Sequence, residues 1–288
     1  MALKLMFITN DKHVAKIAEK NGVDWIFVDL EIKGKAERQG HMDTVISGHQ
    51  IEDVKHIKSV LSTSKLLVRT NPIYEGSKDE IDQVIQYGSD IVMLPYFKFK
   101  DEVETFIEYV AGRAKVCLLL ETPEAVENMD SILSIPGIDY VHIGLNDLHL
   151  GYGMKFLFEL LADGTVDRIC HKIREYNLPY GFGGIARLGR GELRAEYILG
   201  EHYRLGSSMV ILSRSFCDTG KVTDINEIEK EFTHGVREIR EYETMLKDKD
   251  RDFFVINQRI VRDKVSEIIK ERFKQRTYIL KNDNDRVK

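Results

Sequence analysis

The sequence has few cysteines and prolines and no long apolar run. It contains only three cysteines, Cys117, Cys170 and Cys217, and five prolines among 288 residues. The cysteines lack the spacing of a metal site, so we expect buried thiols in a reducing compartment. No apolar run approaches the roughly 18 residues of a membrane span, and the first residues, MALKLMFITNDK, lack the layout of a signal peptide. These absences predict a soluble cytoplasmic protein without a membrane partner.

The chain also lacks a strong excess of either charge. Its 42 Lys and Arg residues nearly balance 47 Asp and Glu residues, which gives a net charge of −5. A nucleic-acid-binding protein needs a basic surface, and the basic stretch at residues 259–288 is typical of a solvated helix face. Hydrophobic residues make up 43% of the sequence and charged residues 31%, as in ordinary globular proteins. We therefore expect small-molecule partners and no nucleic acid.

Eight short apolar runs recur along the chain, and amphipathic helical patterns lie between them. Most runs are continuously hydrophobic, which favours parallel strands that are covered on both faces. Eight β-then-α units predict a (β/α)₈ TIM barrel. The alternative, an open doubly wound sheet, usually stops near six strands. The runs are LKLMFIT (3–9), WIFVDLE (25–31), KLLVRTN (65–71), DIVMLPY (90–96), KVCLLLET (115–122), YVHIGLND (140–147), PYGFGGIA (179–186) and YRLGSSMVI (203–211).

The character of the sequence changes after Cys217. We predict a barrel catalytic domain over residues 1–217 and a helical extension over residues 218–288. Apolar residues at helical spacing form two stripes in the extension. The first helix is placed to close the barrel as its eighth, whereas the second is surplus and either packs against the barrel or forms the subunit interface of a homo-oligomer. The stripes are Ile225, Ile228, Phe232, Val236 and Ile239, then Ile256, Ile260, Val261, Val265, Ile268 and Ile269.

Two of the apolar runs each deliver an acid at the carboxyl end. Glu121 ends the fifth predicted strand and Asp147 the sixth. Catalytic groups of a (β/α)₈ barrel lie at the carboxyl ends of strands about 4.8 Å apart, so both carboxylates can point into one mouth. Two carboxylates at such a short distance repel each other, and this repulsion raises the pKa of one of them unless a cation lies between them. The pair predicts a divalent metal site, with Mg²⁺ or Mn²⁺ as the ion.

Three more charged residues end strands at the same predicted face. Arg69 ends the third run, and Asp29 and Glu31 end the second. Arginine is a planar fork suited to a carboxylate, so this mixture fits a metal site that receives a small oxo-acid. The alternative is a set of ordinary salt bridges in which Arg69 pairs with Glu31 or Asp29. Spacing alone leaves both interpretations open.

Several of these residues lie in segments that resemble the HpcH/HpaI aldolase and citrate lyase beta-subunit family, which consists of metal-dependent pyruvate-type (β/α)₈ lyases. The segments occur in family order and cover roughly residues 3–216. Each is loose alone, but the block E-T-x-x-A-V…I-x-G-x-x-D-L is fairly specific. The segments are DWIFVDLE, LLVRTNP, GSDIVMLPYF, LLLETPEAVENMDSILSIPGIDYVHIGLNDL and LGSSMVILSRS.

The resemblance implies roles for these residues. Glu121 and Asp147 match the two ligands of the divalent ion, and Arg69 matches the arginine that contacts the substrate's carboxylate or enolate oxygen. Asp29 and Glu31 match the acids of strand two and join Arg69 in the catalytic group. The implied reaction cleaves a 2-oxo acid into an enolate and an aldehyde or acyl partner, or runs in reverse. The backbone amides that would cradle the substrate carboxylate are those of Gly144, Leu145 and Asn146.

The sequence departs from the family pattern in its proton-transfer residues. The aldolase branch has a histidine just after the D-x-E of strand two, where this chain has Ile32, and isoleucine cannot move a proton. His41 and His49 follow in the next segment, and each is either a solvated histidine or one that reaches the mouth. Ser208 stands where many members have aspartate. This pattern predicts a divergent member with a different substrate, or one that has lost activity.

Three other functions stay open. We interpret the segment GFGGIA (181–186) as the exit loop of strand seven; the alternative is that it forms, with Gly206, Ser207 and Ser208, the phosphate pocket that many barrels build after strands seven and eight, in an enzyme that acts on a phosphorylated sugar or acid. A dinucleotide site there is disfavoured because the segment comes late and follows only a short strand. A catalytically inactive barrel that binds an oxo-acid is the second alternative. The third is a subunit of a lyase complex that docks through its C-terminal helices.

Overall fold

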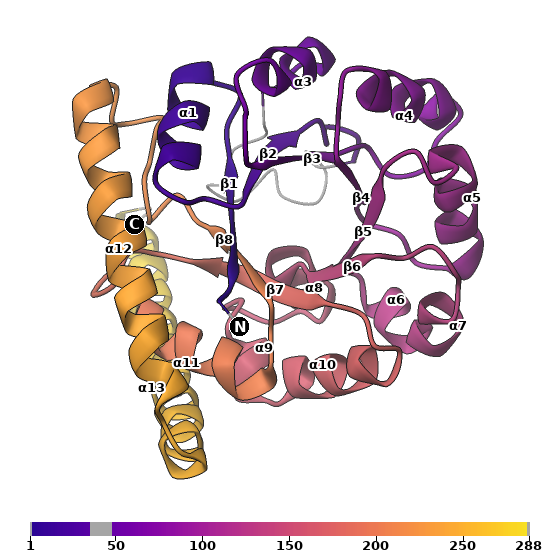
Figure 1. The fold of residues 1–288 in the computed structure, drawn as a ribbon. Coiled ribbons are helices and arrows are strands. Elements are labelled where there is room, and N and C mark those ends of the chain that lie inside the picture. The colour runs from indigo at the N-terminus through magenta and orange to yellow at the C-terminus, as the bar shows by residue number, and fades with distance from the viewer. Residues whose placement is uncertain (1, 35–47, 287–288) are drawn as a thin grey trace.

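The computed structural model describes residues 2–34 and 48–286, with side chains described up to residue 274. Eight parallel strands pair in sequence order and close into a barrel where β8 pairs with β1. Figure 1 looks along this barrel, with the strands around the centre and the helices outside them. The predicted (β/α)₈ fold is confirmed. The strands are β1 (Lys4–Ile8), β2 (Trp25–Asp29), β3 (Lys65–Arg69), β4 (Ile91–Leu94), β5 (Lys115–Leu120), β6 (Tyr140–Ile143), β7 (Tyr180–Ile185) and β8 (Met209–Leu212).

The described helices form the outer layer, and the connection from β6 to β7 carries three of them. Local capping sets where several begin: the Asp11 carboxylate accepts from the amides of His13 and Val14 at the start of α1. The helices are α1 (Lys12–Lys20), α3 (Ile51–Lys58), α4 (Ser77–Gln86), α5 (Lys100–Val110), α6 (Pro123–Glu127), α7 (Met129–Leu133), α8 (Leu145–Gly151), α9 (Glu159–Ala162), α10 (Thr165–Glu175), α11 (Ala195–Leu205), α12 (Ile225–Lys247) and α13 (Arg251–Arg286).

Side chains alternate between the two faces of each strand. Phe27 and Leu67 belong to a buried cluster within the barrel, whereas Val28 belongs to the larger cluster between strands and helices. Two residues further along each strand come Asp29 and Arg69, which pair in register across β2 and β3. Because the period is two, both have the inward direction of the barrel cluster. The fold therefore brings a carboxylate and a guanidinium together at the carboxyl end of the barrel.

Two predicted strand boundaries are wrong. β6 ends at Ile143, so Asp147 lies in the first turn of α8 and not at the end of a strand. β8 begins only at Met209, because residues 203–205 form the last turn of α11. Gly206 ends that helix with a φ of 72°, a left-handed conformation that glycine adopts without a steric penalty.

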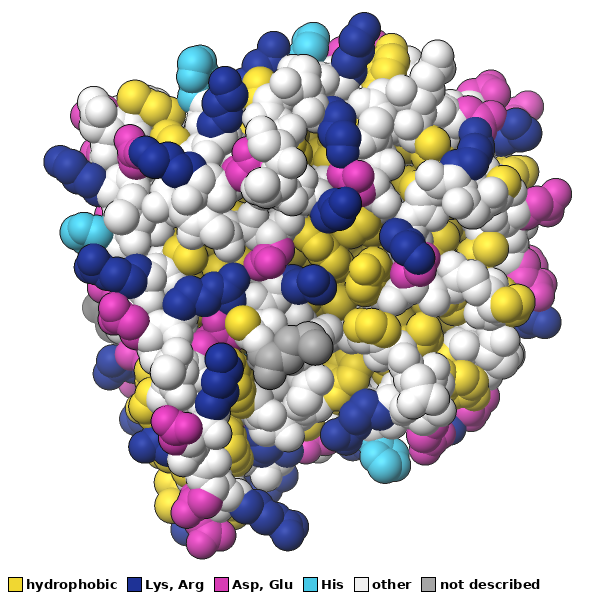
Figure 2. Space-filling view, viewed as in Figure 1, with side chains coloured by type: hydrophobic (Ala, Val, Ile, Leu, Met, Phe, Trp, Pro, Cys, Tyr) yellow, Lys and Arg dark blue, Asp and Glu magenta, His cyan; other side chains and the backbone are white. Residues whose placement is uncertain are grey.

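The two long C-terminal helices lie on one side of the barrel (Figure 1). α12 packs against α1 and α11, and α13 packs against α9 and α11. Figure 2 shows basic, acidic and hydrophobic side chains interspersed over the region where these two helices lie. The surplus helix predicted from the sequence is α13, and it packs against the rest of the chain, which was one of the two expectations for it. The other expectation, a subunit interface, stays a prediction. No described helix combines the length and the apolar character that crossing a bilayer requires.

A buried polar network holds α13 on α11. The Asn257 amide Nδ2 donates to the Tyr197 carbonyl oxygen (3.0 Å) and to Glu201 Oε1 (2.9 Å). Glu201 is fully buried, and its Oε2 accepts from Arg204 Nη2 at 2.6 Å. Gly200 lies so close that a Cβ there would come within 2.6 Å of Asn257 Nδ2. A buried carboxylate is costly without such partners, so Asn257 fixes where α13 sits.

Replacing Asn257 with leucine is expected to lower the free energy of unfolding by roughly 1–3 kcal/mol, because the buried Glu201 loses a donor. The control is Gln258→Leu, one position along, which removes a single contact of 3.3 Å to Asp167. That change is expected to stay within about 0.5 kcal/mol. Urea unfolding monitored by circular dichroism measures both, and equal losses in the two variants would contradict the role of the network.

Candidate active site

The two predicted metal ligands line the same cavity. Glu121 directly follows β5, and Asp147 lies in the first turn of α8. The cavity has a volume of about 210 Å³. Thr122 caps the next helix, α6, which starts with a proline, because the Thr122 Oγ1 accepts from the Ala125 amide at 3.1 Å. The other lining residues are Tyr96, Thr122, Pro123, Leu150 and Gly151.

The Glu121 carboxyl group is buried among other acids. Its side chain is 3% exposed, and its Oε1 accepts from the Tyr96 amide at 3.1 Å. Burial raises the pKa of Glu121 well above its ordinary value, and the charges of Asp147 and Glu31 raise it further. Arg69 opposes these effects without cancelling them. The site therefore favours the presence of positive charge beside Glu121.

Gly144 provides the space for that carboxyl group. A Cβ at position 144 would lie 2.6 Å from Glu121 Oε2 and 2.7 Å from Glu121 Cβ. The Gly144 amide donates to the Leu120 carbonyl at 3.0 Å, so the expectation that it cradles a substrate carboxylate is wrong. The amides of Leu145 and Asn146 are the first two of α8, where backbone N–H groups have no acceptor within the helix.

Arg69 is held by the two acids of β2 and the residues after it. Its Nε and Nη2 donate to Asp29 Oδ1 (2.8 Å) and Oδ2 (2.7 Å), and its Nη1 lies 3.2 Å from Glu31 Oε2. Burial disfavours the charged guanidinium, but these two carboxylates outweigh burial and raise the pKa of Arg69. The salt bridges that spacing left open are thus present. They also hold Arg69 close enough to Glu121 for its charge to oppose the rise in the pKa of that carboxyl group.

The donor set fits a hard divalent cation. Among the described residues no cluster of three or more His, Cys, Asp or Glu side chains is arranged to hold a metal. Glu121 and Asp147 form a pair instead, and Mg²⁺ commonly takes one or two carboxylates and completes its shell with waters and substrate oxygens. The repulsion within the pair and the space left by Gly144 are both consistent with such an ion.

The structure distinguishes the candidate proton-transfer residues. The Ile32 side chain is 56% exposed, and its amide donates to Asn71 Oδ1 at 3.0 Å. His49 lies at the carboxyl end of β2, where its Nδ1 accepts from the Asp29 amide at 3.0 Å. Since an amide can only donate, Nδ1 is unprotonated and the neutral ring has its proton on Nε2. His41 lies outside the described residues.

The prediction of a phosphate pocket after strands seven and eight is wrong. Ser207 and Ser208 precede β8, so they lie at the amino end of the strand, away from the mouth. Their hydroxyl groups are engaged there: Ser207 Oγ lies 2.8 Å from His202 Nδ1, and Ser208 Oγ donates to the Tyr180 carbonyl at 3.0 Å. A phosphorylated substrate therefore has no support from this region.

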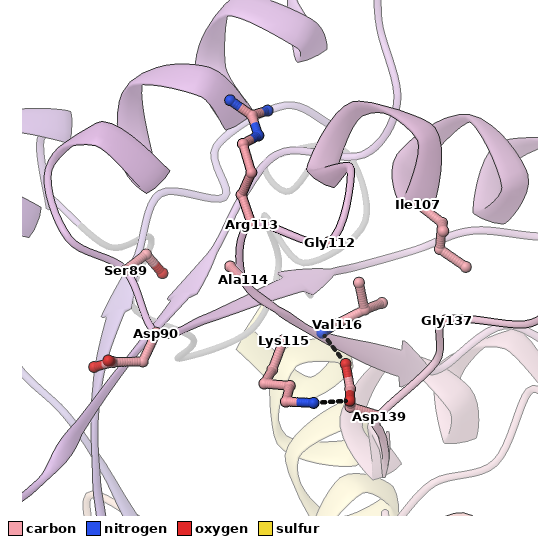
Figure 3. A pocket seen from close by; sticks show the side chains of 10 residues that line it. All are labelled: Ser89, Asp90, Ile107, Gly112, Arg113, Ala114, Lys115, Val116, Gly137 and Asp139. Atoms are coloured by element: carbon pink, nitrogen blue, oxygen red, sulfur yellow. Dashed lines mark hydrogen bonds and ion pairs between the residues drawn. The ribbon is translucent and has the colours of Figure 1, made fainter.

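A larger hollow of about 490 Å³ lies where the chain enters β4, β5 and β6 (Figure 3). Its charged groups are paired within the protein. Lys115 Nζ lies 2.7 Å from Asp139 Oδ1, and Asp139 Oδ2 accepts from the Val116 amide at 2.8 Å. Asp90 pairs with Lys58 at 2.6 Å. Active sites of (β/α)₈ barrels lie at the opposite, carboxyl end, so we assign the chemistry to the smaller cavity.

The closed barrel carries acidic residues at the carboxyl ends of its strands, which is the end where (β/α)₈ enzymes have their active sites. A sequence description of the HpcH/HpaI aldolase/citrate lyase family matches residues 4–156. The chain therefore belongs to this family of carbon–carbon lyases, as its sequence motifs implied. Members of the family act on small molecules and generally depend on a divalent metal.

Curated relatives are aldolases. The 2-keto-3-deoxy-L-rhamnonate aldolase of Shigella dysenteriae is 28% identical over a match that covers 60% of this chain and 71% of that enzyme. The enzyme of the same name from Salmonella paratyphi B is 25% identical, with 52% of this chain and 61% of the relative covered. The chain thus spans less than two thirds of the length of the Salmonella relative.

Solved structures share the fold. The HpcH/HpaI aldolase from Desulfitobacterium hafniense DCB-2 has a TM-score of 0.60 and 16% identity, and the match covers 80% of this chain and 93% of that one. A family member from Burkholderia cenocepacia J2315 has a TM-score of 0.58 and 13% identity, with 79% and 95% covered. At these identities the likeness establishes the barrel alone.

The variant Glu121→Gln is expected to be more stable than the parent at high pH. The pKa of Glu121 is raised in the folded state, so this carboxyl group's contribution is fully present below its unfolded pKa of about 4.5 and is lost as the pH rises through its folded pKa. At pH of about 8 and without metal, we expect a gain of at least about 1 kcal/mol in the free energy of unfolding. Below pH of about 4 the gain disappears.

Urea unfolding over this pH range measures the effect. Glu124→Gln is the matched control, because a hydrogen bond from Lys98 lowers the pKa of Glu124. That substitution is expected to give no gain at high pH. A Glu121→Gln variant that is less stable than the parent at pH of about 8 would contradict the raised pKa.

Proposed function

We propose that this protein is a divalent-metal-dependent lyase or aldolase that makes or breaks a carbon–carbon bond of a 2-oxo acid. The observation that carries the proposal is that Glu121 and Asp147 line one cavity and Arg69 acts electrostatically on Glu121. Membership of the family supports the reaction class. The curated relatives support a 2-oxo acid as substrate, because their names describe 2-keto acids.

Glu121 and Asp147 would hold the ion, with Mg²⁺ or Mn²⁺ as the candidates. When bound, the ion supplies Lewis-acid polarisation of the substrate's carboxylate and carbonyl oxygens. The side chains present fit this role, since both are carboxylates and hard dications prefer oxygen ligands. The amides of Leu145 and Asn146 would then bind the substrate carboxylate at the start of α8.

Arg69 would stabilise the charge that develops during bond cleavage. Breaking the bond between C3 and C4 of a 4-hydroxy-2-oxo acid leaves an enolate, and a guanidinium aimed at its oxygen lowers the barrier. Asp29 and Glu31 contribute by holding that guanidinium in place, because three of its nitrogens contact them. Pre-organisation of this kind needs no rearrangement at the moment of reaction.

The proton of the C4 hydroxyl group must leave during cleavage, and here the chain differs from its family. Ile32 cannot accept a proton, and Asp29 and Glu31 both contact Arg69. His49 lies at the same strand end as Asp29. The exposed Ile32 favours a second candidate function, a barrel that binds an oxo-acid without turnover. Proton exchange at the substrate distinguishes the two.

We also propose a cytoplasmic location and a homo-oligomer formed through the C-terminal helices. All three cysteines are free and buried, which supports a reducing compartment. Val255 and Ile256 at the start of α13 are 55% and 58% exposed, which supports a contact with another subunit.

The oligomer proposal is tested by replacing both Val255 and Ile256 with lysine. We expect the particle mass in sedimentation equilibrium to fall to fewer subunits, because two charges oppose burial of this surface. The paired replacement Arg259→Gln and Arg262→Gln on the same helix is the control, and it is expected to keep the mass. An unchanged mass in the lysine variant removes these two residues from any subunit contact.

The metal proposal is tested by calorimetric titration with Mg²⁺ and Mn²⁺. Glu121→Gln and Asp147→Asn are each expected to weaken binding at least about tenfold, the lower end of losses at metal-site groups. Gly144→Ala is expected to act in the same direction, because its Cβ would overlap Glu121 Oε2. Asp139→Asn, in the hollow at the other end of the barrel, is the control. Unchanged affinity in both ligand variants would refute this metal site.

Turnover is tested by the exchange of pyruvate methyl protons with D₂O, followed by NMR in the presence of the metal. Exchange reports enolate formation without any second substrate. Arg69→Lys is expected to slow it about a hundredfold, the usual loss when one donor to a developing oxyanion is removed. Pyruvate binding without exchange in the parent protein would favour the barrel that binds without turnover.

A further inference from the structure

The cavity that holds the two carboxylates has an apolar side. Besides Glu121 and Asp147, the lining includes the side chains of Tyr96, Pro123 and Leu150, which are called its apolar side here. These three side chains are half-buried, so a molecule in the cavity would cover them further. The sequence motifs gave no role to any of the three.

Among the described lining residues, Thr122 adds a polar side chain to those of Glu121, Asp147 and Tyr96, and its hydroxyl group is already engaged. The Thr122 hydroxyl group donates to the Phe97 carbonyl at 2.7 Å and accepts from the Ala125 amide at 3.1 Å. Thr122 is 1% exposed. Its hydrogen-bonding capacity is directed into the fold, so it offers little to a hydroxyl group of a substrate.

The apolar side is also rigid. Tyr96 has a φ of 49°, a strained left-handed conformation for a bulky residue, and the hydrogen bond that its amide donates to Glu121 Oε1 holds it there. Lys98 Nζ, two residues on, pairs with Glu124 at 2.8 Å and ties the same loop to α6. Pro123 packs against Gly151, where a Cβ would lie 2.6 Å from its ring. The shape of this surface is therefore set before a ligand arrives.

Resting on the proposed function, we propose that the second substrate of this enzyme is a small aldehyde with an apolar chain, which lies against Tyr96, Pro123 and Leu150. The cavity of about 210 Å³ is smaller than the roughly 300–1,000 Å³ of sites for drug-sized ligands, so the chain is short. A hydroxylated chain would lose its hydrogen bonds to water on entering and find few replacements.

The reaction is balanced without an oxidant or reductant. In the direction of synthesis, the pyruvate methyl group loses a proton, and its carbon bonds to the carbonyl carbon of the aldehyde. The aldehyde oxygen takes up a proton, which gives a 4-hydroxy-2-oxo acid. Cleavage reverses each step. Only the chain beyond the aldehyde carbon contacts the apolar surface, so this surface selects the second substrate and leaves the pyruvate half unaffected.

The test compares propanal with glycolaldehyde, two aldehydes of similar size that differ by a methyl group in place of a hydroxyl group. We expect kcat/KM for the addition of pyruvate to be about 10- to 100-fold higher for propanal, the range that apolar pockets achieve. Leu150→Asn, which makes the surface polar and keeps the number of side-chain heavy atoms, is expected to reduce this ratio at least about threefold. Pro123→Ser provides a second variant with the same expected direction.

Tyr152→Gln is the control, because Tyr152 is exposed, lies two residues after Leu150 and does not line the cavity. It is expected to leave the ratio unchanged. Three outcomes would overturn this inference alone. They are a preference for glycolaldehyde, a ratio that neither Leu150→Asn nor Pro123→Ser lowers, and no reaction with either aldehyde while pyruvate exchange persists. If the parent protein shows no metal-dependent exchange of the pyruvate methyl protons, the proposed function is overturned, and this inference is overturned with it.

Discussion

The repulsion between buried carboxylates determines the character of this barrel mouth. Asp29 engages two nitrogens of Arg69, and Glu31 contacts the third. Glu121 is then left beside Asp147, and its pKa is raised by burial first and by that neighbour second. Such a pair is destabilising in the protein alone and favourable only once positive charge is near it. A loss of stability of this kind is common at functional sites, and it agrees with the metal site proposed here.

The fold imposes this arrangement through simple periodicities. The side chains of a strand alternate between its two faces. The next inward positions at the carboxyl ends of β2, β3 and β5 therefore hold Asp29, Arg69 and Glu121, which are a carboxylate, a guanidinium and a carboxylate. The fourth charge comes from a different device, the first turn of α8, which starts immediately after Gly144. A side chain at position 144 would displace Glu121. The glycine therefore matters as a space, and its φ of −82° is accessible to any residue.

The sequence predicts the barrel well because eight apolar runs are a periodic signal, and it predicts the location of Glu121 and Arg69 because strand ends in a barrel share one face. It fails where a residue's role depends on local geometry. Ser208 was expected near the mouth, but α11 extends to Leu205 and moves the start of β8 past it. The amide of Gly144 was expected to bind substrate, but it bonds to β5. No sequence pattern reports such backbone partners.

Asp29 contacts both Arg69 and His49 at the carboxyl end of β2. Its carboxylate orients Arg69, and its amide donates to His49 Nδ1. The imidazole is thereby held in the tautomer that donates from Nε2, which suits a group that gives a hydrogen bond to a substrate oxygen better than one that removes a proton. The family's histidine position is an exposed isoleucine here. Under the proposed function, a donor held at the same strand end as Arg69 suits stabilisation of negative charge on a substrate oxygen better than it suits removal of a proton.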